Sequence, residues 1–242
     1  MHTTGQAGPS WENGPFTPVC AGGRVLVARC EPEGVNVGLV VGDARALLVD
    51  VGTHPAQGAA LRAAADDVAD RLTGVRVGAA VLTHDHYDHW FGLAGTPGLE
   101  AWAHAGLGEP TGSSAAWLGR VGLPAAPQPC RRIDDGGRHV LDLGGLSAVI
   151  EHHGAAHTRT DLTVLVPAAG VLFAGDLVEE SGPLQHGPES DPARWPRVLD
   201  ALLERLAAHP GARVVPGHGA AVDAAFVRAQ RQELTARRRP RF

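Results

Sequence analysis

Short apolar runs, separated by glycine and polar residues, dominate the first part of the chain. Such runs are typical of buried strands, and they predict strands at residues 24–30, 35–41, 46–49 and 75–82. Gly42 and Asp43 stand between the second and third runs and predict a hairpin turn. Residues 55–72 instead follow an alanine-rich helical pattern, with Pro55 in the first turn.

The second half of the chain repeats this theme. Helices are predicted at residues 90–93, at 191–208 with Asp191 as cap and Pro192 in the first position, and at 220–237. Residues 104–136 are predicted to be irregular, as are many loops that wall a binding site. Apolar runs predict further strands at residues 99–102, 140–143, 148–151, 162–166, 171–174 and 213–215. Strand groups and helices occur twice, which favours an α/β fold of two packed sheets with helices outside.

The length of 242 residues suits one sizeable domain. Residues 1–21 are polar, with scattered glycine and proline, and predict a flexible N-terminal lead-in before a single domain at residues 22–242. All 21 basic residues are arginine, which excludes lysine nucleophiles, Schiff bases and P-loop chemistry. The net charge of −5 gives no general attraction to nucleic acid or to acidic membranes.

Three cysteines, Cys20, Cys30 and Cys130, form no C-x-x-C motif and are odd in number. They are expected to be free thiols in a reducing compartment. The N-terminal segment lacks the charged start and apolar run of a signal peptide, and no apolar run approaches the length of a membrane span. We therefore expect a cytoplasmic protein without a membrane partner.

The densest chemistry lies in residues 83–90, Thr-His-Asp-His-Tyr-Asp-His-Trp, directly after an apolar run. If the chain is still extended at His84 and His86, their spacing puts both rings on one side. Asp88 and His89 then fall where a helix would begin. Imidazole and carboxylate groups together suit a borderline ion such as zinc.

Three more metal-capable residues stand at the ends of predicted strands, each near a glycine. His157 precedes one strand, Asp176 follows Gly175 after another, and His218 follows Gly217 after a third. Side chains at the ends of different strands can converge on one site. The sequence therefore predicts that these residues join the histidine motif.

The order of these signals resembles the metallo-β-lactamase superfamily: H-x-H-x-D-H, a distant histidine, Gly-Asp after an apolar strand, then Gly-His. The resemblance spans residues 50–218. It implies an αββα sandwich with a two-metal site at one edge of the sheets, holding two divalent ions, zinc first, with iron or manganese as alternatives. Its metal ligands are His84, His86 and His157 for the first ion, Asp88, His89 and His218 for the second, and Asp176 as the bridge. Asp50 takes the place of a carboxylate that steadies the site from outside.

Two positions depart from the family pattern, which usually has glycine before the third histidine and again three residues after it. Here Ala156 and Thr160 stand at those positions. The neighbouring His152 and His153 sit in a poorer context for metal binding. We interpret them as structural residues at a strand end.

Two divalent ions can share a water and lower its pKa toward neutrality. The chain is therefore predicted to be a metal-dependent hydrolase, in which a metal-bridging hydroxide attacks an ester, thioester or lactone of a small molecule. Asp88 is assigned a catalytic part, orienting the hydroxide and later receiving its proton. No Gly-x-Ser-x-Gly motif offers a serine nucleophile instead.

The substrate pocket is predicted to include Tyr87, Trp90, Glu179 and His186, with the loop at residues 177–192 and residues 104–136 as its walls. The subfamily stays open. Zinc β-lactamases generally lack the bridging aspartate, glyoxalase II-type thioesterases add a helical domain, and lactonases place a tyrosine after the bridging aspartate, whereas the only tyrosine here is Tyr87.

Three other functions remain as alternatives. The first is a two-metal phosphodiesterase or nuclease, although the C-terminal arginines are typical of a solvated helix end. The second is a diiron redox protein, whose relatives place a glutamate where His86 stands and add a flavin domain. The third is a non-catalytic metal-binding module. We expect a small-molecule substrate and no nucleic-acid partner, and the oligomeric state stays open.

Overall fold

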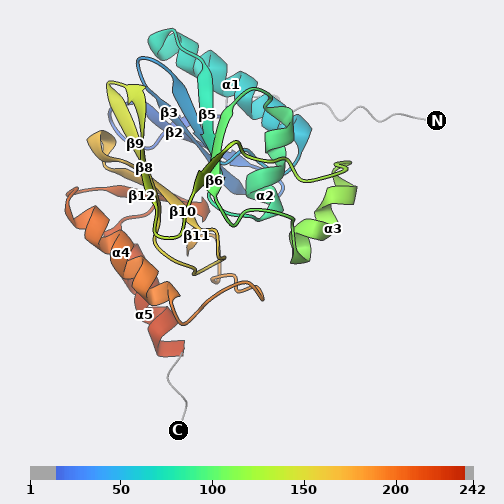
Figure 1. The fold of residues 1–242 in the computed structure, drawn as a ribbon. Helices are drawn as coiled ribbons and strands as arrows, with labels where there is room; N and C mark the ends of the chain where they lie inside the picture. Colours follow the sequence, from blue (N-terminus) through green and yellow to red (C-terminus); the bar gives the residue numbers. More distant parts are fainter. Residues whose placement is uncertain (1–14, 238–242) are drawn as a thin grey trace.

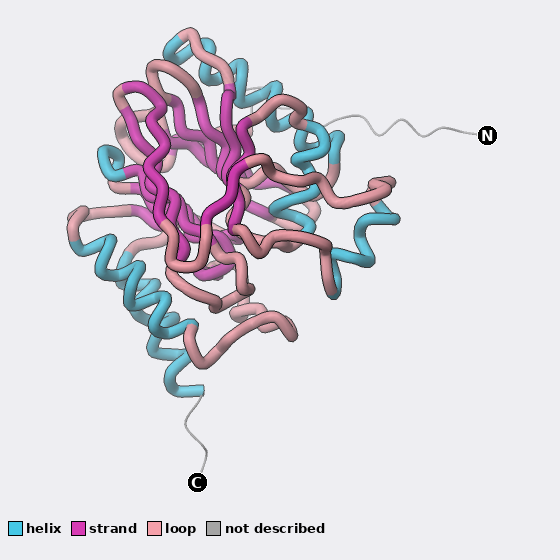
Figure 2. Tube along the Cα trace, viewed as in Figure 1, coloured by secondary structure: helices cyan, strands magenta, loops and turns pink. Residues whose placement is uncertain are grey.

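The computed structural model describes residues 15–237, in which strands gather in two central layers with helices on both outer sides (Figures 1 and 2). The first layer has the hydrogen-bonded order β1-β2-β3-β4-β5-β6-β7. Its strands are β1 (Thr17–Pro18), β2 (Val25–Cys30), β3 (Val35–Val41), β4 (Ala46–Val49), β5 (Val77–Val81), β6 (Glu100–His104) and β7 (Arg131–Ile133). The strands from β1 to β4 pair antiparallel, and those from β4 to β7 pair parallel.

The second layer continues the order as β12-β11-β10-β9-β8, with β11 and β12 parallel and the other pairs antiparallel. Its strands are β8 (Arg138–Gly144), β9 (Leu146–His152), β10 (Leu162–Val166), β11 (Val171–Glu179) and β12 (Arg213–His218). One residue pair, His218 with Val35, joins β12 to β3. The two layers therefore meet at a single rung.

Helix α1 (Pro55–Thr73) covers the outer face of the first layer, and α4 (Trp195–Ala207) and α5 (Ala224–Arg237) cover the second (Figure 1). The start of α1 follows from its sequence, because Pro55 takes the first turn and the His54 ring accepts the N–H of Gln57 at 3.2 Å. Gly74 ends the helix with φ of 73°. The remaining helical segments are α2 (Tyr87–Trp90), α3 (Gly112–Arg120) and the 3₁₀ turns η1 (Phe91–Gly95) and η2 (Pro167–Ala169).

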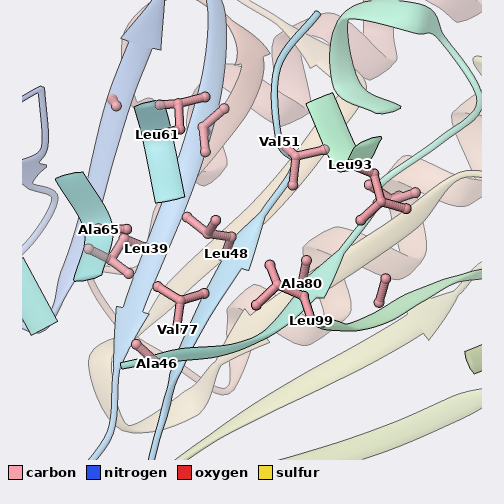
Figure 3. Close-up of a cluster of buried hydrophobic side chains, with 14 of the residues drawn as sticks. Leu39, Ala46, Leu48, Val51, Leu61, Ala65, Val77, Ala80, Leu93 and Leu99 are labelled. Atoms are coloured by element: carbon pink, nitrogen blue, oxygen red, sulfur yellow. The ribbon is translucent and has the colours of Figure 1, made fainter. Parts of the chain in front are cut away.

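Three buried apolar clusters lie between these layers and pack them together. Leu61 and Ala65 of α1 pack on Leu39 and Leu48 of the first layer (Figure 3). A second cluster fills the space between the two sheets, and a third packs the second sheet against α4 and α5. Helix, sheet, sheet and helix follow one another, which confirms the predicted αββα sandwich.

Three local predictions need correction. Residues 104–136 are not wholly irregular, because Trp117 of α3 stacks on Tyr87 and β7 pairs with β6. Helix α4 begins at Trp195, because Asp191 caps a preceding turn, accepting the N–H groups of Ala193 and Arg194 at 3.0 Å. Helix α5 begins at Ala224 rather than at residue 220.

Part of the segment predicted as a lead-in, residues 1–21, packs against the domain. Phe16 is buried in the core, and the adjoining β1 pairs with β2. An aromatic side chain with apolar surface to bury is enough to fix this short strand. Residues 1–14 of the predicted lead-in lie outside the described part of the chain.

No helix within residues 15–237 is long and apolar enough to cross a membrane. Cys20, Cys30 and Cys130 are free thiols, as the sequence predicts. Burial raises the pKa of the Cys30 thiol to about 12, so this group is held in its neutral form.

Candidate metal centre

The four metal-capable residues of the histidine motif follow the carboxyl end of β5, on the turn and short helix that lead out of the first layer. The second layer supplies His157 from the connection between β9 and β10, Asp176 from β11, and His218 from the end of β12. The β3–β12 rung brings these ends together. All seven side chains that the sequence assigns as ligands therefore lie at one edge of the sandwich.

A first group consists of His84, His86, His157 and Asp176, whose ligand-type atoms lie within 4.8 Å of one another. His157 Nε2 lies 3.1 Å from His86 Nδ1 and 3.4 Å from Asp176 Oδ2. His84 Nε2 lies 3.8 Å from the same oxygen. Three imidazole nitrogens and one carboxylate oxygen thus face a common point, a donor set that would suit zinc.

A second group consists of Asp88, His89 and His218. Asp88 Oδ2 lies 3.4 Å from His218 Nε2 and 3.7 Å from His89 Nε2. The other oxygen of Asp176 also faces this group, at 3.3 Å from His89 and 3.7 Å from His218. Asp176 therefore directs Oδ2 at the first group and Oδ1 at the second, the arrangement expected of a bridging carboxylate.

A glycine keeps this carboxylate in place. A Cβ on Gly217 would overlap Asp176 Oδ1, so the backbone beside His218 can approach the carboxylate only without a side chain. The Gly-His pair that marks this strand end in the sequence has a steric reason in the structure.

Each of the five histidines turns its second nitrogen away from the centre toward an oxygen atom. The pairs are His84 Nδ1 with Thr83 Oγ1 (3.0 Å), His86 Nε2 with Glu189 Oε1 (2.8 Å), His89 Nδ1 with Asp50 Oδ2 (2.8 Å), His157 Nδ1 with the Gln185 carbonyl (3.3 Å) and His218 Nδ1 with the Glu33 carbonyl (3.1 Å). An oxygen acceptor holds the ring proton on the outer nitrogen, which leaves a lone pair on the inner one. In each ring these contacts favour, for the neutral form, the tautomer that binds a cation.

The centre also contains polar atoms that no described protein group satisfies. His84 Nε2, His89 Nε2 and Asp176 Oδ1 are buried and lack a hydrogen-bond partner within residues 15–237. Buried polar atoms are rarely left in this state without an ion or a ligand. The donor set and its unsatisfied atoms therefore fit two divalent cations.

Burial and neighbouring charges shift the pKa values in opposite directions. Burial lowers the pKa of His84 well below its usual range and that of His157 to about 4, so both rings are neutral and ready to coordinate. Burial alone would raise the pKa of Asp176, but the imidazole of His89 holds it well below its usual range. Burial opposes charge on His89 too, yet Asp176, Asp88 and Asp50 raise its pKa well above the ordinary value.

Asp50 lies beside this centre, where the sequence places it as an outer carboxylate. Its Oδ1 accepts the Thr83 N–H at 2.7 Å, and its Oδ2 accepts the Thr83 hydroxyl at 2.9 Å and the His89 ring at 2.8 Å. Asp50 also has φ of 64°, the positive value that a non-glycine residue seldom adopts. Backbone strain of this kind persists where surrounding contacts fix a functional group.

The structure departs from the predicted substrate pocket. Trp90 is wrong as a pocket residue, because its ring is fully buried in the core and its Nε1 donates to the Pro127 carbonyl. Glu179 is buried and accepts the N–H and hydroxyl of Ser181, while His186 is exposed beside Trp195 at a ring distance of 5.3 Å. Tyr87 stacks on Trp117.

A cleft of about 890 Å³ adjoins the centre on the side of His86 and contains none of those four residues. Its walls include residues 104–106 and 134–135 from the predicted loop, together with Pro188 and Glu189 from the second predicted wall. Sequence reasoning missed Glu189, the partner of His86. An acidic residue in a loop far along the chain carries no local sign that it meets a histidine ring.

A separate cluster of metal-capable side chains, the His104 cluster, comprises His104, Asp135 and His152. His104 Nε2 lies 3.1 Å from Asp135 Oδ1, and the two rings lie 4.3 Å apart. In both rings Nδ1 accepts a backbone N–H, from Gly106 at 3.1 Å and from Gly136 at 2.9 Å. Their remaining proton must then sit on Nε2, the opposite arrangement to that of the metal centre.

Comparisons with known proteins agree with this geometry. The profile of the metallo-beta-lactamase superfamily matches residues 30–218. The metallo-beta-lactamase type 2 of Bacteroides fragilis is 29% identical over 82 residues, which are 33% of this chain and 32% of that protein. The chain thus aligns with about a third of the length of that relative.

Solved structures with the same fold include the metallo-beta-lactamase FIM-1 of Pseudomonas aeruginosa in its mono-zinc form, with a TM-score of 0.69 and 23% identity over 97% of this chain and 100% of that one. A metallo-beta-lactamase of Erythrobacter litoralis also has a TM-score of 0.69, with 21% identity over 95% and 99% of the two chains. At these identities the likeness shows the fold alone. Together with the profile match over most of the chain, it shows that this protein belongs to the metallo-β-lactamase superfamily.

Proposed function

We propose that this protein is a metal-dependent hydrolase with a dinuclear metal centre, zinc being the ion that best suits its ligands, and that it cleaves an ester, thioester or lactone of a small molecule. The observation that carries the proposal is the position of Asp176, whose two oxygens face two separate groups of histidines. That arrangement supports two ions held a short distance apart.

When bound, two such ions supply a Lewis acid for a carbonyl oxygen and ionised water at neutral pH. The chain's own residues hold and orient them. The five outer oxygen partners fix the ring orientations, and Asp50 and Thr83 lock the segment that carries His84 and His89. Fixing the ligands in advance avoids rearrangement during the reaction.

Asp88 is the residue proposed to handle protons. Burial opposes its ionisation, but His89 and the hydrogen-bonded His218 lower its pKa. It is therefore ionised at neutral pH, as a ligand oxygen and a proton acceptor both require, although a lowered pKa makes it a weaker base.

The cleft beside His86 supports a small-molecule substrate, because its volume of about 890 Å³ falls within the range of small-molecule sites. It is rich in polar groups, including Asp85, Glu109, Arg159 and Glu189. Two of its lining residues border the first metal group, because Asp85 stands between His84 and His86 in the chain and Glu189 bonds to His86.

A second candidate is hydrolysis of a β-lactam. It is favoured by the names of the solved structures that share the fold, several of which are metallo-beta-lactamases. The bridging aspartate weighs against it, because zinc β-lactamases generally lack that residue. We therefore rank it below ester-type hydrolysis.

The test is a panel of esters, thioesters, lactones and β-lactams, assayed with zinc-loaded protein, chelated protein and an Asp176→Ala control. We expect turnover of at least one ester-type substrate, lost on chelation and reduced by roughly 10³-fold in the control. Activity that survives chelation would contradict metal dependence, and turnover of β-lactams alone would favour the second candidate.

A further inference from the structure

A buried polar network lies between the loop that carries His157 and the histidine motif of the first layer. Its members Thr158, Thr160 and Asp161 are 0%, 2% and 3% exposed, although each has a polar side chain. Buried polar groups at this density persist only when they are mutually satisfied. The question is what this network holds in place.

The carboxylate of Asp161 accepts the N–H groups on either side of His157. Its Oδ2 lies 3.2 Å from the Ala156 nitrogen and 2.9 Å from the Thr158 nitrogen, and its Oδ1 accepts the Thr158 hydroxyl at 2.8 Å. The backbone is therefore fixed both before and after the histidine.

The same network crosses to the first layer. The Thr160 N–H donates to the Thr158 hydroxyl at 3.0 Å, and the Thr160 hydroxyl donates to Asp85 Oδ1, also at 3.0 Å. Asp85 stands between His84 and His86 in the chain. A continuous path of hydrogen bonds thus links the loop of His157 to the segment that carries the other two histidines of the first group.

This path runs through the two positions where the sequence departs from the family pattern. Ala156 contributes the N–H that Asp161 accepts, and Thr160 supplies the hydroxyl that reaches Asp85. Thr160 thus adds a side-chain hydrogen bond at a position where the family pattern usually has glycine.

We propose that Asp161 is a positioning residue for the first metal group, setting the distance between His157 and the His84–His86 pair through Thr158, Thr160 and Asp85. The inference rests on the proposed metal centre. It adds a residue that is not a ligand but affects the first metal group more than the second. Mutation of residues that orient metal ligands from outside typically lowers metal affinity by about 10–100-fold.

The experiment is a zinc titration of the full-length protein against a chromophoric chelator, with Asp161→Asn and Thr160→Val compared with the wild type. Asparagine keeps the size of Asp161 but turns an amide nitrogen toward the N–H groups flanking His157. We expect Asp161→Asn to lower the affinity for one of the two zinc ions by about 10–100-fold, and Thr160→Val to lower it by about tenfold. The affinity for the other ion should stay within about threefold of the wild-type value. The absorption bands of the first cobalt ion bound should shift in both variants, a change that loss of stability alone would not produce.

Thr163→Val is the matched control, because Thr163 is 1% exposed and its hydroxyl bonds to His153 at 3.0 Å, outside the network. It should lower the midpoint of urea unfolding without changing either affinity. Zinc affinities within twofold of the wild type in both test variants would overturn the proposal, as would an equal loss in the control. If Asp161→Asn fails to fold, Thr160→Val alone decides. Wild-type protein that binds no zinc overturns the proposed function and this inference together, whereas normal binding by the wild type and both variants overturns only the inference.

Discussion

The metal centre and the His104 cluster use the same residue types, yet they are built in opposite ways. Around the metal centre, every outer ring nitrogen faces an oxygen atom, so in the neutral ring the inner nitrogen keeps its lone pair. In the His104 cluster, Nδ1 of each ring accepts a backbone N–H, from Gly106 or Gly136, and the Nε2–H of His104 donates to Asp135. Tautomers are assigned from such partners. The contacts around the metal centre therefore favour the tautomer that binds a cation, whereas those of the His104 cluster favour the opposite one.

The largest expected effect that tests this comparison comes from removing one histidine of each kind. His157→Ala removes a ring of the first group, and His152→Ala removes a similarly buried ring of the His104 cluster. We expect His157→Ala to lower hydrolysis and affinity for one zinc ion by roughly 10²–10³-fold, because an inner ligand is lost. His152→Ala should keep both ions, as measured by metal content after dialysis. Loss of one ion in His152→Ala would show that the His104 cluster binds metal.

A smaller effect is expected from the outer carboxylates. Asp50→Asn disturbs the hydrogen bond to His89 and should lower the affinity for the second zinc ion by about 10–100-fold. Asp135→Asn, its counterpart beside His104, should leave zinc affinity unchanged. Chelator competition measures both. Equal effects of the two substitutions would remove the distinction between the clusters.

The pH dependence of zinc binding sharpens the comparison further. Burial opposes charge on His218, but its hydrogen bond to Asp88 and the charge of Asp176 raise its pKa, and the pKa of His89 is raised too. Below these pKa values a proton occupies the metal-facing side of the ring, so zinc affinity should fall as pH falls, by about tenfold per pH unit for each proton displaced. Calorimetry in buffers of different ionisation enthalpy counts the protons released. Binding that is independent of pH between 6 and 8 would contradict this assignment.

The smallest expected effect concerns stability and belongs to the His104 cluster. Burial lowers the pKa of His152, and nearby His104 lowers it further. The unfolded chain then binds a proton below pH 6.5 that the folded chain does not, so stability falls as pH drops from about 6.5 toward the lowered value, by at most about 1.4 kcal/mol per pH unit. Urea unfolding of His152→Gln should show a shallower loss over this window than the wild type. Identical slopes would mean that His152 does not contribute.

The sequence predicted the layers and the seven converging side chains because both leave a local pattern. Apolar periodicity marks each strand, and the ligands stand at strand ends near glycines such as Gly175 and Gly217. The outer shell left no such pattern. Glu189 meets His86 across 103 positions of the chain, and Thr160 reaches Asp85 across 75. Contacts of this kind depend on how two separately recognisable segments pack.

The pocket was predicted less well, for a related reason. Trp90 follows the histidine motif directly, but the short helix turns its ring into the core, where a large apolar side chain is most stable. The α3 helix was missed because Gly112 and two serines open it, and its place depends on the stacking of Trp117 on Tyr87. Neighbourhood in the chain is a poor guide to which way a side chain faces.

The single rung between β3 and β12 has a consequence for the apoprotein. Four of the seven ligands belong to one half of the sandwich and three to the other. Bound ions would therefore connect two halves that a single residue pair joins through the backbone. Resistance to heat and to proteases should then follow the supply of free zinc in the surroundings, rising with the logarithm of its concentration above the dissociation constant. A shortage of zinc would then lower the amount of folded protein as well as the activity of each molecule.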